Sequence, residues 1–436
     1  MKILLENSKN FNDSFKKILN SRKKIFSENV DEQVKNIIHE IKKNGDKAIV
    51  KFVKKYDQSL INKNKILIDS KVISHHSKKV NIKTLESFKL AIKRITKYHK
   101  KQYPNNYLIK GKGYHLSQRW RPIDSVGLYV PGGKASYPSS LIMNIVPAKI
   151  AGVKRIVVAT PSNKEKFNPY IMAILKFFKI KEVYQIGGAH AIAALAYGTK
   201  TIEPVNKIFG PGNIYVNSAK KQVFGDVGID MIAGPSEIVV VADKNNNPDW
   251  IAADLMAQAE HDENAQSILI TDNIKFAMKV KNSITNMTSK KLKNKVMDKS
   301  LSNFGKIVVI NAIKNAYKYV NKISPEHLHL QTSMNNEIYS KVTNAGAVFL
   351  GSYSTESFGD YIAGSNHILP TNGSARFASG LGVLDFMKRT SFVKMNKKSA
   401  TQLEKHVSNM AEIEQLDGHK MSVKVRQNTK NKYKVD

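Results

Sequence analysis

The spacing of apolar residues along the chain changes near residue 120. Before that point, VDEQVKNIIHEIKKNGDKAIVKFVKKYD (30–57) places aliphatic residues from Val34 to Ile41 at helical spacing. Gly45-Asp46 then marks a turn into a second helix. Residues 1–120 are therefore predicted to be mainly helical, with many polar positions.

From Arg121 onward, short β-branched runs alternate with helical ones. RPIDSVGLYVPGG (121–133) is a strand candidate that ends in a Pro-Gly-Gly turn, and strand-like KRIVVATP (154–161) precedes helical NPYIMAILKFF (168–178). Further strand candidates lie in 182–198, 229–243, 267–272, 306–313, 324–332 and 345–354. Strand–helix alternation indicates a parallel α/β sheet. The tail from about residue 383 is predicted to be charged helix, which gives two α/β units with helical extensions at both ends.

Composition narrows the possible chemistry. The chain has 436 residues, enough for two or more domains, and no cysteine. This excludes disulfides, thiolate zinc sites, iron–sulfur clusters and a thiohemiacetal intermediate. A metal must be held by histidine, carboxylate or amide oxygen. No apolar run approaches the roughly 18–20 residues of a membrane span, and the N-terminus lacks a signal-peptide core, so a cytoplasmic location is expected.

The formal net charge of +35 raises the question of a polyanionic partner. Lysine supplies most of it, in stretches such as KKLKNKVMDK (290–299) and NTKNKYKVD (428–436) that are also rich in asparagine. Joint enrichment in Lys, Asn and Ile is what an A+T-biased genome imposes on any protein, and we favour that explanation. A polyanion-binding surface is the alternative, although no RNP, zinc-finger or helix-turn-helix signature supports it.

Three glycine-containing loops each join a strand to a turn or helix: GLYVPGGK (127–134), GGAHAIAALAYG (187–198) and FGPGN (209–213). Such loops let backbone N–H groups approach a phosphate closely. The G-x-G-x-x-G fingerprint is incomplete, because Tyr215 occupies its third glycine position. Each loop alone is more often a tight turn, but their clustering favours a dinucleotide or similar ligand.

Histidines near acidic residues form the second group of candidates. In SPEHLHL (324–330), Glu326 and His327 are adjacent proton-transfer groups, and an extended strand would point them to opposite faces unless the chain turns there. Surface residues at a strand entrance are the alternative. GDYIAGSNH (359–367) holds Asp360 and His367 in a polar loop, whereas EQLDGHK (414–420) is more simply a solvated tail.

Gln258 and His261 in the predicted helix 249–262 are three residues apart and share one face. The pair is either half of a metal site or the polar face of an ordinary amphipathic helix. With no thiols available, the candidate ligands are Gln258, His261, Asp360 and another histidine.

Taken together, these motifs resemble the histidinol dehydrogenase family. GLYVPGG, GGAHAIAALAYGT, KIFGPGN, DMIAGPSE, LMAQAEHD, SPEHL, GDYIAGSNHILPT and ARFASGLGVLDFMKRTSF occur in that family's order over roughly residues 120–392. The resemblance implies an α/β fold of two incomplete Rossmann-like units, an aldehyde-dehydrogenase-like architecture. It also implies a zinc- and NAD-dependent four-electron oxidation of L-histidinol, through the aldehyde, to L-histidine in histidine biosynthesis.

Site residues carry over from the resemblance by position. It implies zinc bound by Gln258, His261, Asp360 and His419, and a catalytic pair of Glu326 and His327. The implied substrate contacts are Ser236, Gln258, His261, His327, Asp360, His367, Glu414 and His419. The implied NAD contacts are Tyr129, His190 and Asn213, although the family usually has Gln where this chain has His190.

The resemblance also implies a domain plan and a homodimer. The plan is an N-terminal helical segment (1–25), a first α/β domain with most of the zinc and substrate site (26–128 plus 236–382), an NAD-binding α/β domain (129–235) and a C-terminal helical tail (383–436). The tail is expected to complete the partner subunit's active site. No specific nucleic acid or membrane is expected as a partner. An ordinary NAD-dependent alcohol dehydrogenase is the rival enzyme reading.

Overall fold

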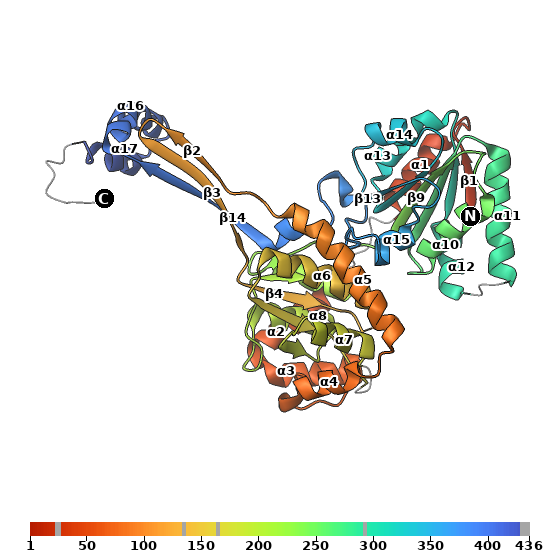
Figure 1. Cartoon of the computed structure of the whole chain (residues 1–436), viewed down its shortest axis with the longest axis horizontal. Coiled ribbons are helices and arrows are strands. Elements are labelled where there is room, and N and C mark those ends of the chain that lie inside the picture. Colours follow the sequence, from red (N-terminus) through yellow and green to blue (C-terminus); the bar gives the residue numbers. More distant parts are fainter. Residues whose placement is uncertain (22–27, 133–136, 163–165, 291–293, 428–436) are drawn as a thin grey trace. The chain divides into compact units, whose positions relative to one another are not determined.

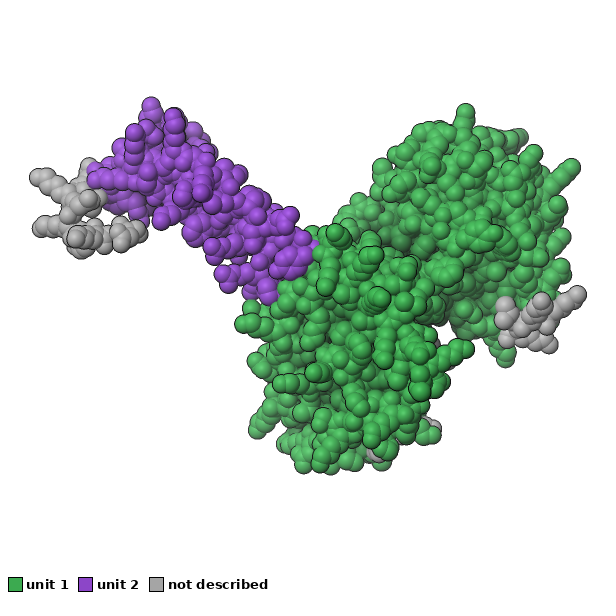
Figure 2. All heavy atoms as spheres, in the orientation of Figure 1, with its two compact units in different colours: residues 1–102, 123–386 green, residues 103–122, 387–436 purple. Residues whose placement is uncertain are grey.

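The computed structural model describes residues 1–21, 28–132, 137–162, 166–290 and 294–427 (Figure 1). Parts of several predictions lie outside these residues, namely 22–27, 133–136, 163–165, 291–293 and 428–436. The chain forms two compact units (Figure 2): unit 1 comprises residues 1–102 and 123–386, and unit 2 comprises residues 103–122 and 387–436.

Unit 1 contains a parallel sheet, here called sheet A, with strand order β1-β11-β10-β9-β12-β13 among the described residues. Its strands are β1 (Lys2–Leu5), β9 (Glu237–Ala242), β10 (Gln266–Thr271), β11 (Lys306–Val309), β12 (His327–Gln331) and β13 (Ala347–Leu350). Strands β9, β10 and β12 are buried along their whole length. This is why β9 and β10 appear in the sequence as continuous apolar runs. Strand β12 (HLHLQ) instead buries polar side chains between its leucines.

Helices cover both faces of sheet A (Figure 1). Val239 and Val241 of β9 pack with α1 (Phe11–Asn20), α13 (Ala316–Ile323) and α14 (Asn335–Lys341). Ile238 and Val240 point to the opposite face and pack with α10 (Pro248–Ala259), α11 (Ile274–Lys290) and α12 (Lys295–Asn303). The two-residue alternation of a strand thus supplies two separate cores.

A second parallel sheet in unit 1, sheet B, has the described strand order β6-β5-β4-β7-β8. Its strands are β4 (Ser125–Tyr129), β5 (Arg155–Ala159), β6 (Glu182–Tyr184), β7 (Lys207–Phe209) and β8 (Gly228–Ile229). The helices that follow its strands are α6 (Pro138–Ala151), α7 (Pro169–Phe177), α8 (Gly188–Tyr197) and α9 (Ile214–Val223). The strand and helix predictions between residues 154 and 198 are confirmed.

The N-terminal helices pack with sheet B. Helices α2 (Glu28–Asn44) and α3 (Asp46–Phe52) share a core with α8, α9 and strand residues of sheet B, as the predicted helical spacing from Val34 to Ile41 requires. Helices α4 (Ser70–Ser77) and α5 (Ile82–His99) complete the segment, with α4 beside α7 and α5 beside α6. The predicted plan grouped residues 26–128 with 236–382, whereas α2 and α3 lie in the core of the other sheet.

Both sheets reverse their strand order at one point. In sheet B the order β6-β5-β4-β7-β8 corresponds to 3-2-1-4-5, and β11-β10-β9-β12-β13 of sheet A repeats it. This is the doubly wound order of Rossmann-like units. The predicted α/β class with two such units is confirmed.

Unit 2 contains an antiparallel sheet, β14-β3-β2, and two helices. The strands are β2 (Tyr107–Gly111), β3 (Tyr114–Pro122) and β14 (Met387–Met395), and the helices are α16 (Lys397–Ile413) and α17 (Asp417–Lys424). Residues 1–120 were predicted to be mainly helical and the tail from about 383 to be helix, and the three strands and β1 depart from this prediction. Strands β2, β3 and β14 expose residues on both faces, so no alternation of buried and polar positions marks them.

Among the described residues, no helix has both the length and the apolar character needed to cross a membrane.

Candidate active site

The predicted pair Glu326 and His327 lies at the amino end of β12, beside the amino end of β9. The chain bends at Glu326, and His327 opens the strand opposite Ile238. Glu326 Oε2 accepts from the backbone N–H of Glu237 at 2.8 Å, and Glu237 Oε2 accepts from the N–H of Glu326 at 3.3 Å. This reciprocal pair fixes the bend, so the turn that the sequence required is present.

The buried His327 ring is surrounded by carboxylates. Its Nδ1 lies 3.1 Å from the backbone oxygen of Glu237, 3.5 Å from Glu356 Oε1 and 3.7 Å from Glu326 Oε2. On the other side of the ring, Nε2 lies 3.6 Å from Asp360 Oδ1 and has no hydrogen-bond partner within the described structure. A buried nitrogen of this kind is suited to a proton, a substrate or a cation.

Helix α15 (Glu356–Tyr361) supplies two of these carboxylates. Glu356 and Asp360 are four residues apart and share one helix face. The helix packs closely against Phe349 because Gly359 has no side chain, and a Cβ at this position would stand 2.5 Å from the Phe349 ring. The sequence motifs predicted Asp360 as a site residue but not Glu356 or Glu237. The i,i+4 carboxylate spacing in ESFGD was the available signal for Glu356.

Gln258 is fully buried on α10, and its side chain lies beside Glu356 and the backbone of Glu237. One end of its amide lies 2.6 Å and 3.2 Å from the two Glu356 oxygens and 3.3 Å from the Glu237 backbone oxygen. Because these neighbours are acceptors, that end is the donating nitrogen. Gln258 Nε2 therefore donates to Glu356.

Burial and charge shift the pKa values of the acids in opposite directions. Burial raises the pKa of Glu326 to about 7 and that of Glu356 to about 8, since a dry environment disfavours their charged forms. Burial also acts to raise the pKa of Asp360, but the nearby imidazole of His327 and the charges of His367 and His261 outweigh it. The pKa of Asp360 therefore lies below its usual value.

The carboxylates around His327 also determine the direction in which its own pKa shifts. Burial favours the neutral imidazole, but the carboxylates of Glu356, Glu326 and Asp360 outweigh this and raise the pKa of His327 well above its usual value. With only protein groups around it, the ring is therefore protonated at neutral pH. A divalent cation beside Asp360 would oppose that field and favour the neutral ring.

His261 lies just beyond the helix that was predicted to carry it. Helix α10 ends at Ala259, and His261 follows in an exposed bend. Asp262 Oδ1 accepts from the N–H of Asn264 at 2.8 Å, a local turn that competes with the helix. The shared helix face of Gln258 and His261 was thus wrong, although His261 still lies close enough for its charge to act on Asp360.

His367 and Ser236 are the other predicted contacts within unit 1. His367 Nδ1 donates to the Asp360 backbone oxygen at 2.7 Å, and its Nε2 lies 3.0 Å from Ser140 Oγ on α6. Burial lowers the pKa of His367, so its ring stays neutral near pH 7. Ser236 immediately precedes β9, and its backbone oxygen accepts from Gln266 at 2.9 Å.

These side chains could hold a metal ion. One ligand atom each from His327, Glu356 and Asp360 lies within 4.8 Å of the others. Of the predicted zinc ligands, Asp360 belongs to this group, Gln258 hydrogen-bonds to Glu356, and His261 is near. His419 and Glu414 are exposed in unit 2, on α17 and at the end of α16.

The predicted NAD residues lie at the carboxyl ends of sheet B strands. Tyr129 ends β4, and its hydroxyl accepts from the N–H of Gly188 at 3.1 Å, while burial raises its pKa to about 12. Asn213 caps α9, and its Oδ1 accepts from the N–H groups of Tyr215 and Val216 at 3.1 Å each. Ligands of doubly wound sheets bind at this edge, near the point where strand order reverses.

His190, the position that departs from the family pattern, is buried. Its ring packs beside Phe52 and Tyr56, and its Nε2 lies 3.5 Å from Asp57 Oδ2. Asp57 Oδ2 in turn accepts from the N–H of Gly187 at 3.1 Å. The imidazole is therefore packed against two aromatic rings and near Asp57, and its Nε2 makes no hydrogen bond among the described residues.

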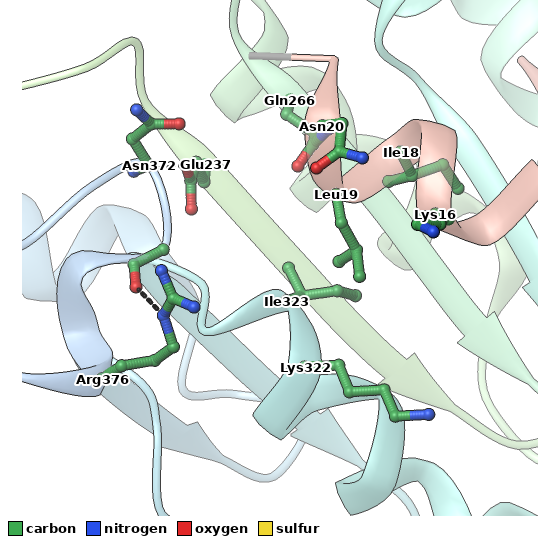
Figure 3. Close-up of a pocket in the computed structure, with 11 residues that line it drawn as sticks. Lys16, Ile18, Leu19, Asn20, Glu237, Gln266, Lys322, Ile323, Asn372 and Arg376 are labelled. Atoms are coloured by element: carbon green, nitrogen blue, oxygen red, sulfur yellow. Dashed lines mark hydrogen bonds between the residues drawn. The ribbon is translucent and has the colours of Figure 1, made fainter. Parts of the chain in front are cut away.

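A cavity of about 280 Å³ lies on the other side of Glu237 (Figure 3). Its lining includes Glu237, Gln266 and Asn372 at the amino ends of β9 and β10, together with Lys16, Lys322 and Arg376. Glu237 Oε1 accepts from the N–H of Asn372 at 2.6 Å. None of the predicted site residues lines this cavity, and Glu237 links it to the catalytic pair.

Comparisons with known proteins agree on one family. A family model described as histidinol dehydrogenase matches residues 20–427. The histidinol dehydrogenase of Agrobacterium fabrum is 44% identical over 430 residues, covering 98% of this chain and 99% of the relative. That of Rhodopseudomonas palustris is 44% identical over 430 residues, covering 98% and 100%. The crystal structure of histidinol dehydrogenase from Elizabethkingia anophelis has a TM-score of 0.92 and 35% identity, covering 98% of both chains.

Proposed function

The chain belongs to the histidinol dehydrogenase family and is an NAD-dependent oxidoreductase, and from this premise we propose the specific reaction and its residues. The proposed reaction is the zinc-dependent four-electron oxidation of L-histidinol, through L-histidinaldehyde, to L-histidine, with reduction of two NAD. The observation that carries the proposal is the buried pair of Glu326 and His327 beside Asp360 and Gln258.

The metal assigned to this site is one zinc ion per subunit. Its ligands would be Gln258, His261, Asp360 and His419 of the partner subunit. Nitrogen and oxygen donors of this kind suit zinc in a chain without cysteine. The buried, unpartnered Nε2 of His327 and the low pKa of Asp360 support a cation here. Bound zinc would supply a Lewis-acid anchor for the nitrogen atoms of histidinol and so fix its carbinol carbon.

His327 is the proposed base for the alcohol. The neutral ring accepts the hydroxyl proton as a hydride leaves the carbinol carbon, and Glu356 and Glu326 stabilise the imidazolium that results. The hydrogen bond from Nδ1 to the Glu237 backbone oxygen sets the tautomer, leaving Nε2 as the accepting atom.

Glu326 is the proposed base for the second oxidation. A pKa of about 7 lets its carboxylate remove a proton from water while remaining largely ionised just above neutral pH. The water attacks the aldehyde carbonyl, and the hydrate then loses the second hydride. Because no thiol is needed in this route, it is consistent with the absence of cysteine.

Substrate recognition is assigned to the same group and its neighbours. Ser236 and His367, together with the zinc ligands and His327, would contact histidinol, and Glu414 of the partner subunit would bind its cationic end. Asp360, Glu326 and Glu414 would make the pocket locally acidic, which favours a cationic substrate over an anionic one.

NAD is assigned to the carboxyl edge of sheet B, at Tyr129, His190 and Asn213. Loop 210–213 leads into the N-terminus of α9, where the helix dipole favours an anionic pyrophosphate. The buried ring of His190 supports a contact made through its loop rather than through the imidazole. In this proposal residues 129–235 form the NAD-binding domain and 236–382 carry most of the zinc and substrate site, while α2 and α3 of the predicted segment 26–128 pack with sheet B.

A homodimer is proposed from the surface of unit 2. The described residues of unit 2 that are buried are Met387, Ser399, Ser408 and Ala411, too few for an independent core. The large exposed apolar side chains among its described residues are Tyr103, Tyr107, Leu108, Ile109, Leu116, Phe392, Val393, Met395, Leu403, Val407, Met410, Ile413, Leu416, Met421 and Val425. Because predicted site residues His419 and Glu414 lie on the same unit, a second copy of this chain is the proposed occupant. The cytoplasmic location stays a prediction.

The proposal is tested by following NADH formation from L-histidinol with and without a zinc chelator. We expect histidinol-dependent NADH formation that the chelator abolishes and added zinc restores. Activity that persists in metal-depleted protein would contradict the zinc assignment. Absence of histidinol-dependent NADH formation by zinc-loaded protein would contradict the reaction itself.

A further inference from the structure

The orientation of the Gln258 amide decides whether this residue can bind a metal. An amide binds cations through its oxygen, whereas its NH₂ group has no lone pair to offer. Gln258 is fully buried, so water cannot compensate a wrongly turned amide. Whatever fixes the nitrogen therefore also fixes where the oxygen points.

The nitrogen of Gln258 has Glu356 as its main acceptor. Glu356 Oε1 lies 2.6 Å away, the shortest contact of this nitrogen. The next neighbours of the nitrogen are more distant: Glu356 Oε2 and His327 Nδ1 at 3.2 Å each, and the Glu237 backbone oxygen at 3.3 Å. The Glu237 oxygen also accepts from His327 Nδ1 at 3.1 Å, so it is shared.

Glu356 is itself held in a fixed position. It is buried on the short helix α15, one turn before Asp360. One turn of α15 thus carries both Asp360, a proposed zinc ligand, and Glu356, which accepts from Gln258, the proposed zinc ligand on α10. The Gly359–Phe349 contact holds that turn against β13.

Resting on the proposed function, we infer that Glu356 is a positioning residue for the metal site. Its carboxylate holds the Gln258 amide nitrogen, so that the amide oxygen faces the metal. Glu356 acts through Gln258 and is not itself a ligand, although its oxygen lies within 4.8 Å of ligand atoms on His327 and Asp360. Groups that orient metal ligands in this way typically contribute about 10–100-fold to metal affinity.

The test measures zinc affinity of the purified full-length protein by competition with a chromophoric chelator, without substrate or NAD. The variants are Glu356→Leu and the near-isosteric Glu356→Gln, each made alone and together with Gln258→Leu. Glu337→Gln, an exposed acid on α14, is the control for loss of one negative charge. Thermal unfolding of the metal-free proteins identifies any variant that does not fold.

We expect Glu356→Leu to weaken zinc binding by about 10–100-fold, and Glu356→Gln to weaken it less, since its amide oxygen still accepts from Gln258. In the Gln258→Leu background neither substitution should weaken it further, because the residue that Glu356 orients is gone. If Glu356→Leu does not fold, the same comparison is made with Glu356→Gln.

Equal losses in both backgrounds would overturn the inference, because Glu356 would then act on the metal directly or by charge alone. Unchanged affinity in the folded Glu356 variants would also overturn it, without touching the proposed reaction. If the unsubstituted protein binds no zinc, the proposed function fails and the inference fails with it.

Discussion

Glu326 has a pKa of about 7 because it is buried beside other acids, yet it remains hydrogen-bonded to the backbone of Glu237. Its carboxylate is assigned to the water of the second oxidation and not to the alcohol of the first. Glu326→Gln should therefore largely spare oxidation of histidinol to the aldehyde. It should slow oxidation of the aldehyde by roughly 10²–10⁴-fold, the usual contribution of a general base.

The two half-reactions of the Glu326→Gln variant can be followed separately, by single-turnover NADH formation from histidinol and from histidinaldehyde. Equal loss in both would remove Glu326 from the assigned role. The unsubstituted protein, assayed with both substrates, is the reference.

His99 predicts a pH dependence of stability. It is fully buried, its Nδ1 donates to the Ile95 oxygen at 2.8 Å, and its Nε2 accepts from Asn366 next to His367. Burial lowers the pKa of His99, against the raising effect of hydrogen bonds to backbone oxygens, so the unfolded chain binds a proton more readily than the folded one. This contribution to stability is present above the unfolded pKa and is lost as pH falls through it, near 6.5.

Between about pH 7.5 and 5.5, on either side of the unfolded pKa of about 6.5, His99 is expected to lower the free energy of unfolding as the pH falls. Urea unfolding of the metal-free protein and of His99→Gln, at both pH values, measures this contribution. The variant should lose less free energy of unfolding on acidification than the unsubstituted protein. Parallel losses would show that His99 does not titrate as its burial requires.

At the residue scale, sequence identified groups with a chemical signature and missed the ones that act by position. Glu326, His327 and Asp360 stood out because acids and histidines cluster in short motifs. Glu237 and Glu356 did not, because their importance comes from contacts across 89 residues and between helices. His261 was placed on a helix that ends two residues earlier, since the local turn at Asp262 competes with helical spacing.

At the scale of elements, the loop after β7 depends on a buried ion pair. Lys220 on α9 is fully buried, donates to the Gly210 oxygen at 2.9 Å and pairs with Asp230, which accepts from the Gly210 N–H at 2.8 Å. Gly210 adopts φ +115°, where a Cβ would collide with the Tyr129 backbone oxygen. The ion pair therefore holds both the carbonyl oxygen and the N–H of Gly210, in the tight turn beside the proposed NAD site.

Lys220→Met should leave Asp230 buried without its partner and cost about 3–5 kcal/mol of unfolding free energy. The surviving folded protein should also show a raised KM for NAD, because the loop loses its anchor. The adjacent Lys221→Met is the matched control, since Lys221 is exposed and lies 3.8 Å from Asp31. Similar denaturation midpoints for the two variants would contradict the role given to the pair.

The elements that the sequence predicted correctly are those in which the spacing of apolar residues reflects packing into a core. The helix from Val34 to Ile41 and the strands of sheets A and B bury one or both faces, and their apolar patterns are correspondingly clear. Strands β2, β3 and β14 have no buried face in one chain. Their partner surface, in our proposal, is a second copy, which a single sequence does not display.

At the scale of the whole molecule, the proposed shared active site predicts complementation between two inactive variants. His327→Asn disables the site that a subunit carries in unit 1, whereas His419→Asn disables the site that its unit 2 would complete in the partner. In a mixed dimer, one of the two sites then contains neither substitution. Co-refolding the variants at equal amounts should restore roughly a quarter of the unsubstituted activity, by random pairing of subunits.

Each variant refolded alone should stay inactive, which serves as the control. If the mixture also stays inactive although mixed dimers form, the tail completes the site of its own subunit. Zinc content of the His419→Asn protein alone is a second readout, and unchanged content would remove His419 from the ligand set.

The net charge of +35 is the property of the whole molecule that the proposed reaction does not require. It favours approach of the anionic dinucleotide and opposes approach of a cationic substrate. Lysine-rich stretches with no assigned role fit a bias of the genome better than a site. Salt-resistant, specific binding to nucleic acid would contradict that interpretation.

The central claim is that one site performs two successive oxidations, and the most direct measurement is the amount of NADH formed per L-histidinol consumed. With histidinol limiting and NAD in excess, we predict two NADH per histidinol, with L-histidine as the final product. One NADH per histidinol, with the aldehyde as product, would contradict the claim and indicate an ordinary alcohol dehydrogenase.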